Sequence, residues 1–179
     1  MTAIDLRLAT EADIPSIRDL MARSIAELQR GFLDAAGIAA SRAVMGLDTQ
    51  LIADRTYFVA TIDGALAGCG GWSARATLYG GDHSADLRDA RRLDPAHEPA
   101  RVRAMFTDPA FARRGVGSAI LAACEKAAKA AGFGAAEMMA TLAGEPLYRA
   151  YGYAVAERTQ AAPIDGVAVP LVRMAKKLA

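Results

Sequence analysis

The sequence has few aromatic residues, two cysteines and no long apolar run. Phe, Trp and Tyr make up 6% of its 179 residues. Cys69 and Cys124 are too few for the disulfide framework of a small secreted domain, so we expect two reduced thiols in the core. No stretch approaches the roughly 18 consecutive apolar residues of a membrane-spanning helix, which argues against a membrane segment.

An excess of charge of either sign is also missing. Lys and Arg number 21 and Asp and Glu number 20, so the formal net charge is +1. This balance gives no electrostatic reason to expect nucleic acid or an anionic membrane as partner. Residues 1–5 lack a basic segment followed by an apolar run, so we expect no signal peptide and a cytoplasmic protein.

The hydrophobic share of 53% is that of an ordinary globular protein. The length falls within the usual range of roughly 100–200 residues for one domain, and such a domain can bury a full core. We therefore expect residues 1–179 to form a single domain. No internal repeat or low-complexity tract divides it.

Hydrophobic periodicity predicts a mixture of strands and helices. The spacing is helical over 11–29, 115–131 and 146–151, and one helix or two short pieces are expected between residues 33 and 47. Asp63-Gly64 predicts a tight turn between two strands. Residues 75–99 have no clear period and are interpreted as an insertion or a functional loop. Strands are predicted at 4–9, 57–62, 65–73, 101–107, 135–142, 153–158 and 167–174.

The helix over residues 115–131 is the clearest in the chain. Gly132 is a suitable residue to end it. Glu125 and Lys129 are spaced to form an ion pair on its solvent side. Its buried stripe is predicted to consist of Val116, Ile120, Cys124, Ala127 and Ala131.

A glycine loop, Arg113-Arg114-Gly115-Val116-Gly117-Ser118, connects the strand at 101–107 to this helix. Glycine lacks a Cβ, so backbone amides can turn toward one point and a ligand can approach closely. The first amides of a helix have no partner within it and carry partial positive charge. The segment therefore predicts a phosphate or pyrophosphate site, although the same glycines could serve only a tight turn.

Spacing excludes two common nucleotide motifs. A Walker loop needs Gly-x-x-x-x-Gly-Lys-Ser/Thr, which the chain lacks. A dinucleotide fingerprint needs a third glycine where this chain has Ile120.

The window from Ala112 to Gly117 resembles the cofactor motif Arg/Gln-x-x-Gly-x-Gly/Ala of the GNAT (Gcn5-related N-acetyltransferase) superfamily. Ala112 departs from its first position. The resemblance implies an α/β fold with a central, mostly antiparallel sheet that contains a splayed parallel strand pair and is flanked by helices. It also implies that acetyl-CoA is bound by Met105, Phe106, Thr107, Arg113, Arg114, Gly115, Val116, Gly117 and Ser118.

A second segment, Leu147-Tyr148-Arg149-Ala150-Tyr151-Gly152-Tyr153, resembles the family's aromatic-Tyr-x-x-x-Gly-Phe segment. Tyr148 matches the tyrosine and is implied to protonate the departing thiolate, because a phenol of reference pKa ~10 is protonated at neutral pH. Tyr151 is its rival if the alignment slips. Where the family often has Asn, this chain has Thr141.

The general base is not determined by the sequence. His83, His97 and Glu145 are candidates, but each could equally be a solvated surface residue, and family members often use a water chain. Trp72 fits a core aromatic better than a wall of the acceptor pocket. The charged run at residues 86–92 fits a solvated face better than a lid.

The resemblance implies an acetyl-CoA-dependent N-acetyltransferase that acts on a primary amine of a small molecule. Two alternatives stay open: acetylation of a protein lysine or N-terminal amine, and an inactive CoA-binding regulatory module. No metal is expected, and only the family's habit speaks for a homodimer. Residues 30–50 and 75–99, which are the hardest to place, are expected to form the acceptor pocket.

Overall fold

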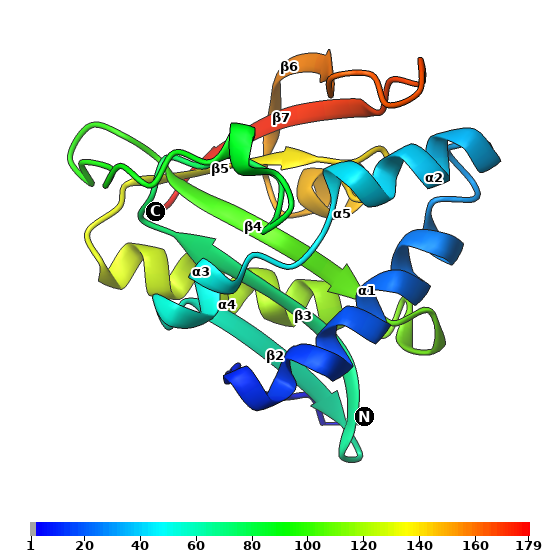
Figure 1. Ribbon diagram of the computed structural model, residues 1–179. Helices are drawn as coiled ribbons and strands as arrows, with labels where there is room; N and C mark the ends of the chain where they lie inside the picture. The colour runs from blue at the N-terminus through cyan, green and yellow to red at the C-terminus, as the bar shows by residue number, and fades with distance from the viewer. Residues whose placement is uncertain (1–2) are drawn as a thin grey trace.

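The computed structural model describes residues 3–179 as a seven-stranded sheet with helices on both faces (Figure 1). The strand order is β1-β2-β3-β4-β5-β7-β6. The strands are β1 (Asp5–Leu8), β2 (Tyr57–Ile62), β3 (Ala65–Ser73), β4 (Ala100–Thr107), β5 (Ala135–Ala140), β6 (Ala154–Gln160) and β7 (Pro170–Lys177). The α-helices are α1 (Ile14–Leu28), α2 (Ala35–Val44), α3 (Thr49–Ala53), α4 (Val116–Ala130) and α5 (Glu145–Ala150), and single 3₁₀ turns are η1 (Glu11–Asp13), η2 (Ala85–Leu87) and η3 (Pro109–Phe111).

All neighbouring strands are antiparallel except β4 and β5. These two strands pair only at Ala100–Ala136 and Arg101–Glu137, and they diverge beyond that point. Where they meet, the Glu137 carboxylate binds the guanidinium groups of Arg101 and Arg173. The predicted sheet with a splayed parallel pair is therefore confirmed. Within residues 3–179 no helix is both long and apolar enough to cross a bilayer.

A β-bulge bends β4 away from β5. The pairing of β3 with β4 shifts between Cys69 and Gly71, and Ala104 takes the left-handed conformation with φ of 50°. The fully buried Tyr57 of β2 donates a hydrogen bond of 2.8 Å from its hydroxyl to the Ala104 carbonyl. A bulge bends its strand and strengthens the local twist, so this contact helps to direct the second half of β4.

Replacing Tyr57 with Phe is expected to lower the free energy of unfolding by about 1 kcal/mol, because the Ala104 carbonyl loses its donor while the ring stays in place. Urea denaturation followed by fluorescence measures this change. The matched control is Tyr151→Phe at a 37% exposed tyrosine, which should stay within about 0.5 kcal/mol of the wild type. Equal stabilities for the two variants would show that the hydroxyl does not support the bulge.

Helices α1 and α4 pack on opposite faces of the sheet (Figure 1). Two glycines of β3 let α4 approach closely. A Cβ atom on Gly68 would lie 2.4 Å from Val116 Cγ1, and one on Gly70 would lie 2.9 Å from Ile120 Cγ2. The small residues of β3 thus set how near the first turns of α4 come to the sheet.

The buried face of α4 differs in part from the predicted stripe. Leu121 and Ala128 are buried, whereas Ala127 is only partly buried and Ala131 is exposed. The reason is that α4 also packs against the cluster around β5 and β7, to which Leu121 belongs, so its apolar face is broader than one stripe.

The predicted ion pair between Glu125 and Lys129 is wrong. Glu125 instead binds Lys176 Nζ of β7 at 2.9 Å. Lys129 donates to the backbone carbonyl of Ala179. A partner on a strand can displace one on the same helix, and spacing along the helix does not reveal such a partner.

Cys69 and Cys124 are both reduced and buried, as expected. Burial raises the pKa of the Cys69 thiol to about 12, with a hydrogen bond to Tyr57 opposing the shift. Burial also raises the pKa of Cys124. Neither thiol is therefore a thiolate nucleophile near neutral pH.

Candidate active site

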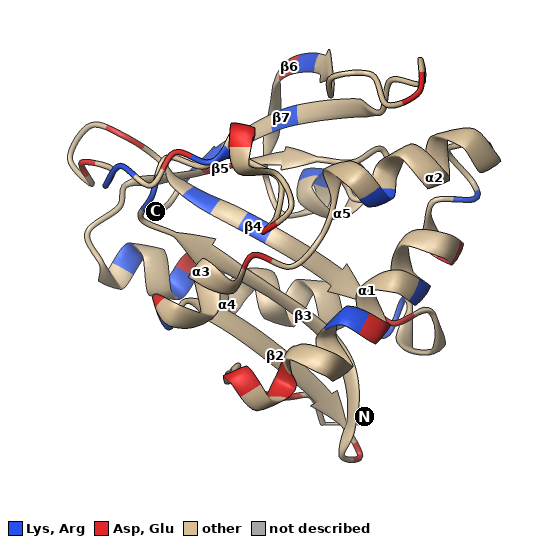
Figure 2. Ribbon diagram, in the orientation of Figure 1, with Lys and Arg blue, Asp and Glu red and all other residues tan. Residues whose placement is uncertain are grey.

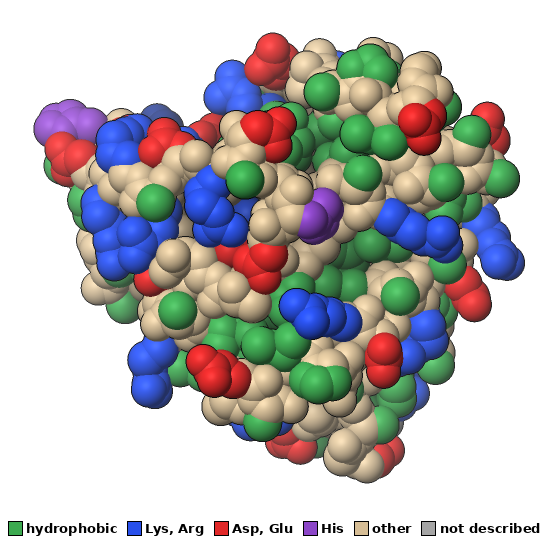
Figure 3. Space-filling view, in the orientation of Figure 1, with side chains coloured by type: hydrophobic (Ala, Val, Ile, Leu, Met, Phe, Trp, Pro, Cys, Tyr) green, Lys and Arg blue, Asp and Glu red, His purple; other side chains and the backbone are tan. Residues whose placement is uncertain are grey.

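A cavity of about 950 Å³ opens where β4 and β5 diverge. The second half of β4, the end of β5 and the first turns of α4 and α5 form one part of its lining. The rest comes from the glycine loop with Ala112 before it, from the C-terminal ends of α1 and α2 and the residues after them, from residues 78–80 and from Leu171 of β7. Figure 3 shows apolar side chains gathered in a hollow where Figure 1 places the ends of α1 and β4.

The glycine loop turns sharply before it enters α4. Arg113 has φ of 64° and Gly115 has φ of 85°, so two of its residues take left-handed conformations. Left-handed backbone is costly for a residue with a side chain, and such strain often accompanies a functional site. The amides of Val116, Gly117 and Ser118 begin the helix and have no partner within it. All three residues line the cavity.

Asp108 fixes the start of this loop. Its Oδ1 atom accepts a hydrogen bond from the Ala110 amide at 2.9 Å, and its Oδ2 atom binds Arg23 Nη2 of α1 at 2.6 Å. Burial opposes ionisation of Asp108, but these donors outweigh it and hold the pKa of the carboxyl below its ordinary value. The loop is thus tied to α1 by a charged contact.

The cavity brings together most of the residues predicted from the sequence. Arg114 is the exception, since it does not line the cavity and its guanidinium lies 5.2 Å from the centre of the Phe111 ring. A role for Arg114 in cofactor binding stays a prediction. The predicted residues that do line the cavity are Met105, Phe106, Thr107, Arg113, Gly115, Val116, Gly117, Ser118 and Tyr148.

Tyr148 lies on α5, which begins just after β5. The Thr141 hydroxyl accepts a hydrogen bond from the Gly144 amide at 3.2 Å, which helps the chain turn into α5. Tyr148 is 7% exposed, and its ring packs edge-on against Tyr153 with 6.0 Å between the ring centres. Burial raises the pKa of Tyr148, so its phenol remains protonated well above neutral pH. Tyr151 also lines the cavity, from an exposed position.

The three candidate bases do not reach the cavity lining. His83 bonds the Ala43 carbonyl through Nε2 at 2.8 Å. His97 is exposed and pairs with Asp94, which raises its pKa through a hydrogen bond. Glu145 binds the guanidinium groups of Arg149 and Arg158. Each of the three side chains is bonded to another group of the chain, and none of them is positioned in the cavity to act as a general base.

Two further expectations can be compared with the structure. Trp72 is buried and packs edge-on against Phe133 at 6.0 Å, which confirms it as a core aromatic. Residues 78–80 of the irregular 75–99 segment line the cavity, whereas the charged run at 86–92 does not.

A buried ion pair supports the cavity wall and was not found from the sequence. Arg103 of β4 binds Asp48 at 3.0 Å, and the two side chains are 3% and 2% exposed. Arg103 also donates to the Gly80 carbonyl at 2.9 Å, and Arg88 binds the other oxygen of Asp48 at 3.2 Å. Burial lowers the pKa of Arg103, while Asp48 opposes that shift. Figure 2 shows that the basic residues of β4 lie in its first half and that its second half is uncharged.

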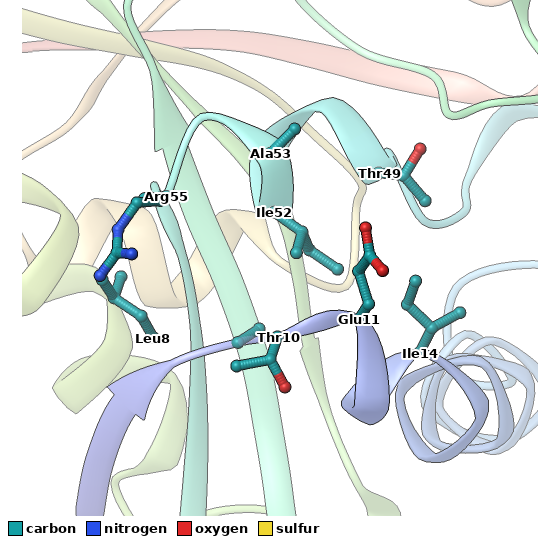
Figure 4. Close-up of a pocket in the computed structure, with 9 residues that line it drawn as sticks. Leu8, Thr10, Glu11, Ile14, Thr49, Ile52, Ala53 and Arg55 are labelled. Carbon is teal, nitrogen blue, oxygen red and sulfur yellow. The ribbon is translucent and has the colours of Figure 1, made fainter.

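A second cavity of about 660 Å³ lies beside β1 and α3 and contains none of the predicted residues. Figure 4 shows Arg55 next to Leu8 at one side of it, and Glu11 and Ile14 at the other. No charged contact joins Arg55 to Glu11 among the ion pairs of residues 3–179. The cavity between β4 and β5 is therefore the candidate active site.

Comparisons with known proteins agree with this fold. A family model described as an acetyltransferase (GNAT) domain matches residues 53–155. The chain has no significant match among curated protein sequences. It is similar in fold to a GCN5-related N-acetyltransferase from Rhodopseudomonas palustris, with a TM-score of 0.72, 19% identity, and coverage of 99% of this chain and 98% of that one.

Two more solved structures share the fold. One is yncA from Salmonella typhimurium with its cofactor acetyl-CoA, with a TM-score of 0.66, 15% identity, and coverage of 99% of this chain and 95% of that one. The other is the ribosomal-protein-S18-alanine N-acetyltransferase from Escherichia coli, with a TM-score of 0.62, 15% identity and the same two coverages. At such identities the similarity concerns the fold alone.

Proposed function

Because this chain belongs to the GNAT acetyltransferase family, we propose that it transfers an acetyl group from acetyl-CoA to a primary amine of a small molecule. The observation that carries the proposal is the cavity between the diverging strands, with the start of α4 in its wall. Structures of the same fold include one with bound acetyl-CoA.

The glycine loop fits the pyrophosphate of acetyl-CoA. The amides of Val116, Gly117 and Ser118 can donate to phosphate oxygens, and the helix dipole favours negative charge there. A Cβ atom on Gly117 would lie 2.9 Å from Leu147 Cδ2, so this position has little room for a side chain. The exposed Arg113 adds a full positive charge at the same end. Ala112 contributes no charge, so at that position only the backbone can take part in binding.

The second half of β4 fits the pantetheine arm. From Ala104 to Thr107 the strand has no strand partner on its β5 side within residues 3–179, because the β4–β5 pairing ends at Arg101. An extended ligand with amide groups can therefore bond to this free strand edge. Met105, Phe106 and Thr107 line the cavity along this edge and would hold the arm and the acetyl carbonyl.

The transfer forms a bond between the amine nitrogen and the acetyl carbon and breaks the bond from that carbon to sulfur. Backbone amides of β4 would stabilise the carbonyl oxygen as it gains charge. Tyr148 would donate its proton to the departing thiolate, and the attacking amine would lose a proton to water. The products are an N-acetyl amine and CoA with a free thiol.

A concave cavity of about 950 Å³ suits a small acceptor better than a folded protein surface. The similarity in fold to the ribosomal-protein-S18-alanine N-acetyltransferase keeps an N-terminal amine as a second candidate. The test is CoA release from acetyl-CoA with a panel of small amines and peptides with free N-termini. Turnover of a small amine above the hydrolysis background is expected. If the protein binds acetyl-CoA but acetylates no amine, the proposed acetyl transfer is contradicted and an inactive CoA-binding module is favoured.

Replacing Gly117 with Val is expected to weaken acetyl-CoA binding by about tenfold or more, because the new side chain would fill the space beside the first amides of α4. Isothermal titration calorimetry measures this loss. Gly134→Val is the matched control, since a Cβ atom there meets no atom within 4 Å. If Gly117→Val bound acetyl-CoA as tightly as Gly134→Val, the start of α4 would not be the phosphate site.

A further inference from the structure

One buried polar group of the cavity lacks a partner. Gln29 follows α1 directly, is 4% exposed and lines the cavity. Its Nε2 group lies 3.7 Å from Met45 Sδ, whereas Oε1 accepts no hydrogen bond within residues 3–179. Buried polar atoms without a partner are rare and costly, so this oxygen calls for a donor from outside the chain.

Helix α1, which Gln29 follows directly, covers one face of the sheet, whereas the glycine loop opens α4 on the other face (Figure 1). The cavity is thus reached from both faces, with the phosphate-binding amides on one and Gln29 on the other. A thioester held along β4 would be approached by the acceptor from the α1 face.

The α1 face of the cavity is apolar. Phe32 is 48% exposed although it is aromatic, and it stands in the cavity lining. An exposed aromatic side chain there offers contact area to an apolar ligand. Other large apolar or aromatic side chains on this side are Leu28, Val44, Met45, Leu78, Tyr79 and Leu171.

The cavity also lacks negative charge. Among its lining residues within 3–179 there is no Asp, Glu or His, and the only charged ones are Arg103 and Arg113. The charge of Arg103 is already balanced by Asp48 at 3.0 Å. A protonated acceptor amine would find no counter-ion here. Any further positive charge on the acceptor would also be buried without compensation.

We propose that Gln29 Oε1 accepts a hydrogen bond from an N–H group of the acceptor, and that the acceptor is a monoamine with an apolar or aromatic body. The proposal rests on the acetyl transfer proposed above. A neutral amine has two N–H bonds and a lone pair, so one hydrogen bond to Gln29 leaves the lone pair free to attack the thioester. A carboxylate in this position would instead favour the unreactive ammonium form.

The test compares CoA release with 2-phenylethylamine, spermidine and an alanine-initiated peptide. We expect kcat/KM for 2-phenylethylamine to exceed the other two about tenfold or more. In Gln29→Leu, KM for 2-phenylethylamine should rise about fivefold while the Kd of acetyl-CoA stays unchanged. The variant removes an unpaired buried oxygen, so its Tm should equal or exceed that of the wild type. Gln160→Leu, at an exposed glutamine of β6, is the matched control.

Faster turnover of spermidine or the peptide would overturn the proposed acceptor class and leave the acetyl transfer intact. An unchanged KM in Gln29→Leu would overturn the role of Gln29. If no amine is turned over, the acetyl transfer fails, and calorimetry of 2-phenylethylamine with the CoA-saturated protein decides the site separately. Binding that Gln29→Leu weakens supports the site, and no binding to the wild type overturns it.

Discussion

Replacing Asp48 with Ala is expected to lower the free energy of unfolding by about 3–5 kcal/mol, because it leaves Arg103 buried without a counter-ion. The effect should exceed that of a lost hydrogen bond, since Arg103 cannot become neutral by a modest pKa shift. Asp48 also binds Arg88 and caps α3 through the Gln50 amide at 3.0 Å. Urea denaturation at neutral pH measures the loss.

Two further variants separate the buried charge from loss of a carboxylate in general. Glu98→Ala removes the partner of Arg91 in an exposed ion pair, and its effect should be far smaller than that of Asp48→Ala because water screens the exposed charges. Asp48→Leu combined with Arg103→Met removes both buried charges and should recover much of the loss, because the uncompensated guanidinium is gone. A double variant no more stable than Asp48→Ala would show that the packing of Asp48, rather than its charge, matters.

Replacing Tyr148 with Phe is expected to reduce kcat by about 10²–10⁴-fold, the usual contribution of a general acid. The Kd of acetyl-CoA and the Tm should change little, since the buried ring still packs against Tyr153. Steady-state and binding measurements on the same preparation separate these effects. Tyr151→Phe, the other tyrosine in the lining, is the matched control. A full kcat in Tyr148→Phe would remove it as the acid, and a loss in Tyr151→Phe alone would assign that role to Tyr151.

The pH profile gives an independent measure of the same group. Burial raises the pKa of Tyr148 above its ordinary value, so the protonated, donating form persists to higher pH than for a free tyrosine. For an alkylamine acceptor, kcat/KM should therefore rise with pH as the amine loses its proton, with no decline from Tyr148 below about pH 10. A decline near neutral pH would point to a different acid.

The parts of the fold that local pattern determines could be predicted from the sequence. β2 and β3 coincide with the two strands predicted on either side of the Asp63-Gly64 turn, and α4 follows the glycine loop as expected. The five-residue helix α3 was missed, because so short a segment has no measurable period. The stripe of α4 was misjudged at Ala131, since the helix ends at Ala130 and Ala131 is an exposed residue beyond it.

The candidate site divides in the same way. The glycine loop and the Tyr148 segment could be located because their residues are adjacent in sequence and match a family's motifs. Asp48 and Arg103 are far apart in the sequence and come into contact only in the folded chain, so no spacing rule links them. Gln29 is a single glutamine at the end of a helix. Only the folded structure shows that its Oε1 atom is buried and accepts no hydrogen bond within residues 3–179.

The short contact between β4 and β5 has a consequence for hydrogen exchange. Beyond Arg101 and Glu137 the facing edges of the two strands have no strand partner among residues 3–179. Amide protons on those edges exchange with solvent through small local fluctuations, whereas amides paired to β3 or β7 need a larger opening. A ligand lying between the strands would slow exchange along this seam and hardly elsewhere. Deuterium uptake in peptides from β4 and β5, measured by exchange mass spectrometry, would therefore show whether a ligand occupies the cavity between the two strands.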